Sequence, residues 1–298
     1  MCMAQLFCQS SERMEQVDDD SVSLTVTSPP YWNAIDYNAH VGDSQSWYRD
    51  RKYAEGFDDY DSYLDLMQRI FGEVLRVTKP GGFCAVVIGT VLMKGTHIPA
   101  PFDLVTRLMH AGWFFHQDIV WHKTTAGVRR AGVAIRKPYP GYYYPNIMTE
   151  YIMIFRKFGT PIYKQAYNNR EQSRFEIDDV FKMDVANNVW HIAPVPPNML
   201  DHPCPFPEEI PYRLIRIYSY RGDVVLDPFC GSGQTAKVAV ALGRHSINYD
   251  IKEDYINYAQ SRISTPLKIR PKQLVARFEK VFANAPPTGA QSQSILSW

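Results

Sequence analysis

Hydrophobic positions along the chain follow two periodicities in turn, one typical of strands and one typical of helices. The stretch VSLTVT at 22–27 has the β-branched composition of a buried strand. From Asp61 to Val77 apolar residues recur at helical spacing, and KPGG at 79–82 is a helix stop signal. The alternation predicts an α/β fold with a doubly wound, mostly parallel sheet covered by helices on both faces. The other expected elements are a strand at 83–89, a helix at 101–110, strands at 115–123 and 150–157, a helix at 207–220, and a strand, glycine loop, helix and strand within 223–251.

Three stretches interrupt this alternation. Residues 33–57 are polar and aromatic, which predicts a long functional loop rather than a regular element. Residues 157–200 are rich in polar side chains, Asn and Pro, and we expect an insertion or small subdomain there. The tail at 281–298 consists mainly of small and polar residues and is expected to be poorly ordered.

Composition narrows the class of protein. The chain has 298 residues, 45% of them hydrophobic, which suffices for one large α/β domain with insertions. Its longest apolar run, near 83–89, is far shorter than a membrane span, and its start lacks a signal-peptide pattern. The five cysteines form no C-x-x-C pair, and the histidines lack partners at ligand spacing, so neither a disulfide framework nor a metal site is expected. These features predict a cytoplasmic protein.

Charge is distributed unevenly along the chain. Residues 121–175 hold ten Lys/Arg and two Asp/Glu, a net charge of +8, which leaves −7 for the rest of the chain. A basic segment on a slightly acidic body is typical of a surface that contacts a phosphate backbone, although a solvated loop rich in Arg is the alternative. Interleaved aromatics in KPYPGYYYPN at 137–146 favour nucleic acid, because bases stack on such rings.

A glycine loop indicates a nucleoside ligand. In VVLDPFCGSGQT, Gly231 and Gly233 follow an apolar strand and precede an Ala/Val-rich helix, where ligands bind beside a helix N-terminus. The loop lacks the third glycine of a dinucleotide fingerprint and the Gly-Lys-Ser/Thr of a phosphate loop. Asp250 ends the next strand, where a carboxylate can accept hydrogen bonds from ribose hydroxyls. A nucleoside site without phosphate chemistry suggests S-adenosylmethionine, with Asp227 orienting its amino-acid part. A simple glycine turn is the alternative.

The stretch TVTSPPYW at 25–32 suits a methyl acceptor. Two prolines end the strand, because each lacks an N–H and has a fixed φ. The Ser28 hydroxyl and the Pro29 carbonyl can accept both hydrogens of an exocyclic amine and aim its lone pair at the methyl group. Pro30 adds rigidity, which holds the reacting atoms in a near-attack geometry. Tyr31 is expected to stack on a base that has left the duplex.

Together these motifs make the chain resemble the amino-methylating DNA methyltransferases. SPPY at 28–31 matches their catalytic motif, and FCGSG at 229–233 matches their cofactor motif. The catalytic motif comes first, as in the circularly permuted β group, in which HPCPFP at 202–207 corresponds to a segment near the methionine end of the cofactor. The resemblance implies cofactor contacts by Phe206, Pro207, Asp227, Pro228, Phe229, Gly231, Ser232, Gly233, Thr235 and Asp250.

The same resemblance implies a division of the chain and a partner. Residues 1–156 and 201–280 are expected to form the catalytic and cofactor-binding halves of one domain, with target recognition in 157–200. Expected partners are double-stranded DNA and, in a restriction–modification system, a cognate endonuclease; both a monomer and a homodimer remain open. Basic residues at 122–146 are expected to contact phosphates, because their Gly-rich surroundings offer little rigidity for base reading. They are Arg129, Arg130, Arg136 and Lys137.

The first residue of the catalytic motif bears on the target base. The serine form, Ser28 here, is usually associated with N4-cytosine methylation in this family, whereas aspartate is usual for N6-adenine. Adenine therefore stays the runner-up. Gln9 stands where relatives often carry an acidic residue. A glutamine side chain at this position can still hydrogen-bond adenine. Methylation of RNA or of protein amides, and a silent DNA-binding module that kept the fold, are remoter alternatives.

Overall fold

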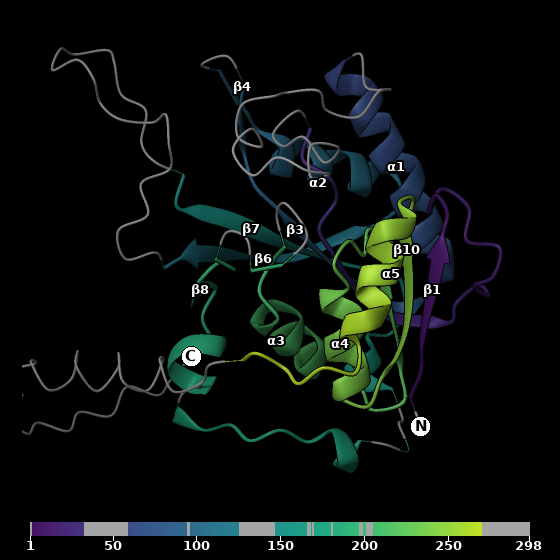
Figure 1. The fold of residues 1–298 in the computed structure, drawn as a ribbon, viewed down its shortest axis with the longest axis vertical. Coiled ribbons are helices and arrows are strands. Elements are labelled where there is room, and N and C mark those ends of the chain that lie inside the picture. Colours follow the sequence, from purple (N-terminus) through teal and green to yellow (C-terminus); the bar gives the residue numbers. More distant parts are fainter. Residues whose placement is uncertain are drawn as a thin grey trace, which may run out of the picture.

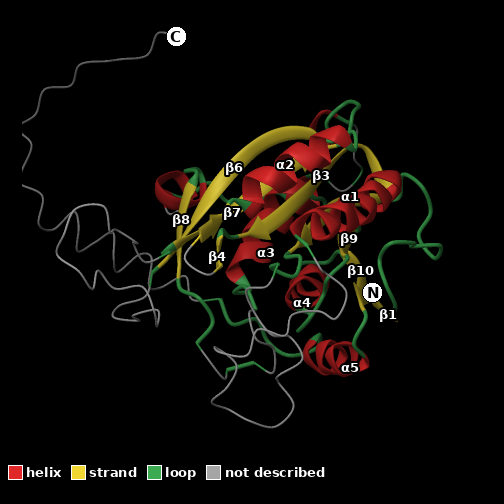
Figure 2. Cartoon of the chain, turned by 90° about the horizontal axis from the view of Figure 1, so that it is seen from above, coloured by secondary structure: helices red, strands yellow, loops and turns green. Residues whose placement is uncertain are grey.

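The computed structural model describes most of the chain outside the predicted loop and tail. It covers residues 2–32, 59–93, 96–124, 147–165, 168, 170–179, 181–196, 199–200 and 205–269. Within these residues a single large sheet lies between two layers of helices (Figures 1 and 2). The predicted doubly wound α/β fold is therefore confirmed.

The main sheet has eight strands in the spatial order β1-β10-β9-β2-β3-β7-β6-β8. The first five in this order run parallel to one another, whereas β7 is antiparallel to both of its neighbours and β8 is parallel to β6. A separate antiparallel hairpin joins β4 (Val91–Met93) to β5 (Thr96–Ile98). The strands of the main sheet are β1 (Ala4–Cys8), β2 (Val22–Thr27), β3 (Thr78–Ile88), β6 (Phe114–Lys123), β7 (Thr149–Arg156), β8 (Val189–Ile192), β9 (Val224–Asp227) and β10 (His245–Asp250).

Helices cover both faces of this sheet. On one face α1 and α2 pack against one set of alternating side chains, including Val86 of β3, and on the other α3 and α4 pack against the opposite set, including Val87. Helix α5 contacts β1, β10 and α4 (Figure 1). Because β3 is buried on both faces, its apolar run is continuous rather than alternating. The helices are α1 (Tyr60–Val77), α2 (Ala100–His110), α3 (Glu209–Tyr218), α4 (Gln234–Ala241) and α5 (Glu253–Arg262).

Predicted elements correspond closely to the observed ones in the core. Helix α1 begins after Asp59, whose side chain accepts a hydrogen bond from the Ser62 amide at 2.7 Å, an N-cap that satisfies one free donor. It ends before KPGG as predicted, but β3 starts at Thr78, earlier than expected. Gly81 adopts φ +77° within that strand, where an added Cβ would lie 1.9 Å from the Thr160 carbonyl oxygen. The glycine thus permits close contact between two chain segments.

The described residues of the segment 157–200 contain short helical turns and one strand. Two 3-10 turns, Ile162–Lys164 and Glu171–Ser173, are followed by a π-helical turn, Phe181–Val185. Strand β8 then joins the main sheet beside β6. The C-terminal part of the predicted insertion is therefore attached to the main sheet through β8. The predicted loop 33–57 and tail 281–298 lie outside the described residues.

Among the described residues, the helices are all too short or too polar to cross a membrane.

Candidate active site

The candidate site lies where the direction of the sheet connections reverses. Strand β2 leads through α1 on one face to β3, whereas its neighbour β9 leads through α4 on the other face to β10. The carboxyl ends of β2 and β9 therefore lie at the topological switch point of the sheet, the usual ligand position in such folds. Ser28 directly follows β2, and Pro228 directly follows β9. The fold thus brings the two predicted motifs to one edge.

The predicted catalytic residues form a short rigid segment at the end of β2. Pro29 is buried, while Ser28, Pro30 and Tyr31 are half-buried. The Tyr31 hydroxyl donates a hydrogen bond to a carboxylate oxygen of Glu150 on β7, at 2.9 Å. The four residues lie together as the sequence predicts, and their chemical roles remain predictions.

Asp227 connects the two motifs. Its Oδ1 accepts hydrogen bonds from the Thr27 hydroxyl at 2.7 Å and from the Phe229 amide at 3.1 Å. Burial raises the pKa of the Asp227 carboxyl to about 6, although these hydrogen bonds act in the opposite direction. Since Thr27 precedes Ser28, this carboxylate fixes the catalytic segment relative to the glycine loop.

The glycine loop is hydrogen-bonded to the carboxylate of Asp250. The Gly231 amide donates to Asp250 Oδ2 at 2.9 Å, and the Lys252 amide donates to Oδ1 at 3.0 Å. Burial raises the pKa of this carboxyl. Gly233 has φ +73°, and an added Cβ would lie 2.7 Å from the Cβ of Ala259 on α5. Ser232 between the glycines is buried, as is Thr235, whose hydroxyl donates to the Val26 carbonyl at 3.0 Å.

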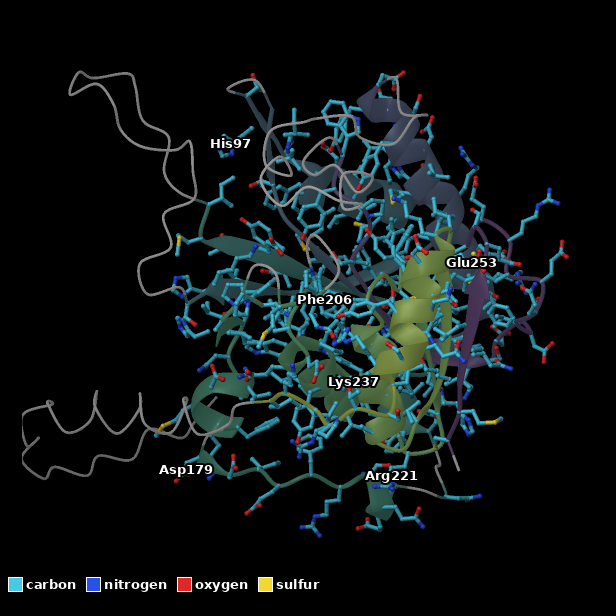
Figure 3. The ribbon with its side chains drawn as sticks, viewed as in Figure 1. His97, Asp179, Phe206, Arg221, Lys237 and Glu253 are labelled. Atoms are coloured by element: carbon cyan, nitrogen blue, oxygen red, sulfur yellow. The ribbon has the colours of Figure 1, made fainter. Side chains whose placement is uncertain are left out.

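Phe206 and Pro207, which precede α3, lie beside the same loop. The Phe206 carbonyl accepts a hydrogen bond from the Gln234 side chain at 2.7 Å. Glu208, which follows Pro207, accepts from Lys237 Nζ at 2.7 Å; Figure 3 labels Phe206 and Lys237. Arg262 of α5 donates to the Ser232 carbonyl and, at 2.6 Å, to the Gln234 side chain. Buried hydrogen bonds therefore join the predicted cofactor residues to α5.

Sequence reasoning missed the polar side chains of this network. Gln234, Lys237 and Arg262 are all buried, and each carries a hydrogen bond that holds the loop or its neighbours. The polar positions within an otherwise Ala/Val-rich helix were the available indication for Gln234 and Lys237, because buried polar groups need partners. Nothing local to the sequence indicates the partner of Arg262.

The predicted phosphate contacts Arg129, Arg130, Arg136 and Lys137 lie outside the described residues. Their segment leaves the sheet after Lys123, at the carboxyl end of β6. Because β6 is antiparallel to β7 and β7 is antiparallel to β3, β6 runs in the same direction as β2 and β9. The basic segment therefore leaves the sheet at the edge that carries the candidate site.

Gln9 is engaged within its own surroundings. Its amide donates to the Arg13 carbonyl at 3.4 Å and to Gln16 at 3.1 Å, and its own oxygen accepts from Gln16 at 3.2 Å. Gln16 also accepts from the Tyr249 hydroxyl at 3.1 Å. The amide of Gln9 is therefore occupied by protein partners in this structure.

The residues present fit a nucleoside cofactor with a charged amino-acid part. Both carboxylate oxygens of Asp250 accept backbone hydrogen bonds, and the carboxylate has further acceptor capacity for a ribose hydroxyl. Gly231 and Gly233 both have positive φ, so the loop turns sharply and presents backbone rather than side chains. Phe229 is only partly buried against the core and offers an apolar surface beside them. Within the described part of the chain, no cluster of His, Cys, Asp and Glu could hold a metal ion.

A family model described as DNA methylase matches residues 22–261. The chain is 28% identical to the type II methyltransferase M.MjaI of Methanocaldococcus jannaschii, an alignment that covers 92% of this chain and 94% of that protein. It is also 28% identical to the type II methyltransferase M.MthZI of Methanothermobacter thermautotrophicus, over 91% of this chain and 79% of that protein.

The chain is also similar to solved structures of a DNA methyltransferase and of a related methylase. TTHA0409 of Thermus thermophilus, in complex with S-adenosyl-L-methionine, is 28% identical with a TM-score of 0.68, and the alignment covers 89% of this chain and 93% of that one. PvuII DNA methyltransferase (cytosine-N4-specific) is 20% identical with a TM-score of 0.62, and the alignment covers 95% of this chain and 94% of that one. The second likeness concerns the fold alone.

Proposed function

This chain belongs to the DNA methylase family of S-adenosylmethionine-dependent amino-methyltransferases, which act on cytosine N4 or adenine N6, and we propose that it methylates cytosine N4 at a specific site in duplex DNA. The observation that carries the proposal is the Thr27–Asp227 hydrogen bond, which joins the catalytic segment to the glycine loop at one sheet edge. Such a junction brings a methyl donor and an acceptor base together. The serine at position 28 supports cytosine as the target.

The cofactor residues divide into two groups by chemistry. Asp250 is suited to bind ribose hydroxyls, while Asp227 and the loop backbone are suited to orient the charged amino-acid part. Phe206 and Pro207 are proposed to lie near the methionine end of S-adenosylmethionine. When bound, S-adenosylmethionine supplies an electrophilic methyl group on a sulfonium sulfur.

The catalytic segment is proposed to prepare the acceptor amine. The Ser28 hydroxyl and the Pro29 carbonyl accept hydrogen bonds from the two amino hydrogens, which directs the nitrogen lone pair at the methyl carbon. The N–C bond then forms as the C–S bond breaks. The extra proton on nitrogen passes to water or to Ser28, so this scheme needs no separate base. The Tyr31 ring stacks on the flipped base.

The DNA partner and the biological setting follow from the same proposal. Duplex DNA is the substrate, with the 157–200 segment proposed to recognise the target sequence and the basic segment to contact phosphates. The type II names of the similar proteins support a cytoplasmic restriction–modification system with a cognate endonuclease.

Nucleoside analysis of labelled DNA tests the proposal. Plasmid DNA from a methylation-deficient host is incubated with the protein and methyl-tritiated S-adenosylmethionine, then digested to nucleosides and separated. Label in N4-methylcytosine is the expected result. Label in N6-methyladenine instead would overturn the choice of base, and unlabelled DNA despite measurable cofactor binding would overturn the methyltransferase activity itself.

A further inference from the structure

A buried carboxylate outside the catalytic and cofactor motifs contacts the catalytic segment. We infer that Glu150, held in place by Lys123, is a positioning residue that fixes the Tyr31 ring for the methyl-transfer step. This inference rests on the proposed function, because it concerns the ring that is proposed to stack on the target base. It assigns a role to two residues that lie outside the catalytic and cofactor motifs.

The geometry places the carboxylate between two partners. One oxygen of Glu150 accepts the Tyr31 hydroxyl hydrogen at 2.9 Å, and the other forms an ion pair with Lys123 Nζ. Glu150 is 6% exposed and Lys123 is 8% exposed. The Lys123 ammonium also lies over the Trp121 ring, 4.9 Å from its centre. Both oxygens of the carboxylate are therefore engaged, and its orientation is fixed from two sides.

Burying an ion pair costs desolvation that its attraction only partly recovers, so such a pair is weak evidence of stabilisation. A buried carboxylate is, however, a strong and directional acceptor, and its hydrogen bond to a phenol restricts rotation of the ring. The pair therefore fits a role in orientation better than a role in overall stability.

The end of β3 reinforces this arrangement. Gly89 follows β3, and a Cβ added there would lie 2.9 Å from Glu150 Cγ and 3.5 Å from a ring carbon of Tyr31. The backbone thus packs directly against both side chains. Ring, carboxylate and backbone are held together by β3, β6 and β7, which follow β2 in the order of the sheet.

Orientation of a stacking ring acts on the chemical step. A base that stacks on a loosely held ring still binds, but its amino group spends less time in line with the methyl group. We therefore expect loss of the Tyr31 hydrogen bond to lower kcat about tenfold, since hydrogen bonds to charged groups are among the stronger ones. The KM for DNA and the affinity for S-adenosylmethionine should change less than about twofold, because neither binding surface is removed.

Two double variants isolate the hydrogen bond from the ion pair. Lys123→Met/Glu150→Leu removes both charges together, which avoids an unpaired buried charge. Lys123→Met/Glu150→Gln differs only by restoring an acceptor for the Tyr31 hydroxyl. We expect the Leu variant to match Tyr31→Phe in its loss of kcat, and the Gln variant to recover most of it. Tyr60→Phe, which likewise removes a tyrosine hydrogen bond to a carboxylate, that of Asp103, is the matched control.

The measurements are steady-state methyl transfer to DNA from a methylation-deficient host and equilibrium binding of S-adenosylmethionine. Combining Tyr31→Phe with the Leu variant should lower kcat no further, because both remove the same hydrogen bond. The inference would be overturned if the effects of Tyr31→Phe and the Leu variant on kcat multiplied, if kcat were unchanged in both, or if cofactor affinity fell in parallel with kcat. None of these outcomes would overturn the proposed function. A wild-type protein that binds cofactor but methylates no DNA would overturn both.

Discussion

The carboxyl group of Asp227 is hydrogen-bonded both to Thr27, beside the catalytic segment, and to Phe229 of the cofactor loop. Burial raises the pKa of this carboxyl to about 6, whereas an aspartate in an unfolded chain has a pKa of about 4. The folded protein therefore binds this proton more tightly than the unfolded chain does. The resulting stabilisation is fully present below about pH 4 and is lost as the pH rises through about 6.

Asp227→Asn should remove this pH dependence, because an amide resembles the protonated carboxyl and does not titrate. Between about pH 4.5 and pH 7 we expect the free energy of unfolding of the variant, relative to wild type, to increase by about 2 kcal/mol. Urea unfolding at both pH values measures the difference, in which the titration of all other groups cancels. A difference that does not change with pH would contradict the assignment.

Gly233 and Gly72 offer a matched pair of substitutions. Gly233→Ala places a side chain at φ +73° and 2.7 Å from Ala259, so we expect the free energy of unfolding to fall by about 2–3 kcal/mol, with weaker S-adenosylmethionine binding. Gly72 lies within α1, and an added Cβ there meets nothing within 4 Å. Gly72→Ala should therefore raise the free energy of unfolding by about 0.5–1 kcal/mol. Thermal unfolding and calorimetric cofactor titration of both variants check this contrast.

Residues with a local signature could be predicted, and residues defined by distant partners could not. Asp227, Gly231 and Asp250 stand at fixed positions around one strand–loop–helix unit, so the sequence alone indicates where they lie. Glu150 contacts Tyr31 across 119 positions of the chain. Only the pairing of β7 beside β3 brings those two side chains together, and a single sequence contains no information on that pairing.

At the scale of elements, the π-helical turn 181–185 and strand β8 are attached to α3 by a buried ion pair. Asp184 pairs with Arg213, whose guanidinium also lies 5.0 Å from the centre of the Trp190 ring. Trp190 is fully buried and donates to the Val185 carbonyl at 3.1 Å. These contacts hold the end of the proposed recognition segment against the body of the domain.

Asp184→Asn leaves the buried guanidinium of Arg213 with less countercharge. We expect this substitution to lower the free energy of unfolding by about 3 kcal/mol. Asp179 provides the control, because its 85% exposed side chain pairs with Lys182 on the surface (Figure 3). Asp179→Asn should change the free energy of unfolding by less than about 0.5 kcal/mol. Equal effects in urea denaturation would mean that the buried pair does not anchor the segment.

Elements with long, consistent patterns were predicted well, whereas short edge elements were missed. The predicted strand 22–27 matches β2, and the predicted helix 61–77 differs from α1 by one residue. Strand β1, however, has only five residues of mixed character, and β8 has four. Both lie at edges of the sheet, where a strand is defined by its partner more than by its own composition.

At the scale of the whole molecule, the uneven charge predicts how DNA binding depends on salt. A quadruple variant, with Arg129, Arg130, Arg136 and Lys137 each changed to Ala, should bind DNA with a shallower slope of log affinity against log salt. Each lost phosphate contact reduces the slope by about 0.9, so a reduction of about 3 to 4 is expected. Fluorescence anisotropy across a salt series measures it. An unchanged slope would remove these residues from the DNA interface.

The position of β9 and β10 in the sheet also determines when the sheet can form during translation. Strands β1 and β2 belong to the first 27 residues, yet β10 and β9 lie between them in the sheet. About 220 residues separate β2 from the end of β10, which a ribosome adds in about 10–45 s. During that time both early strands lack these neighbours. The sheet can close only late in translation, so the nascent chain is exposed to misfolding and to chaperones before its catalytic edge exists.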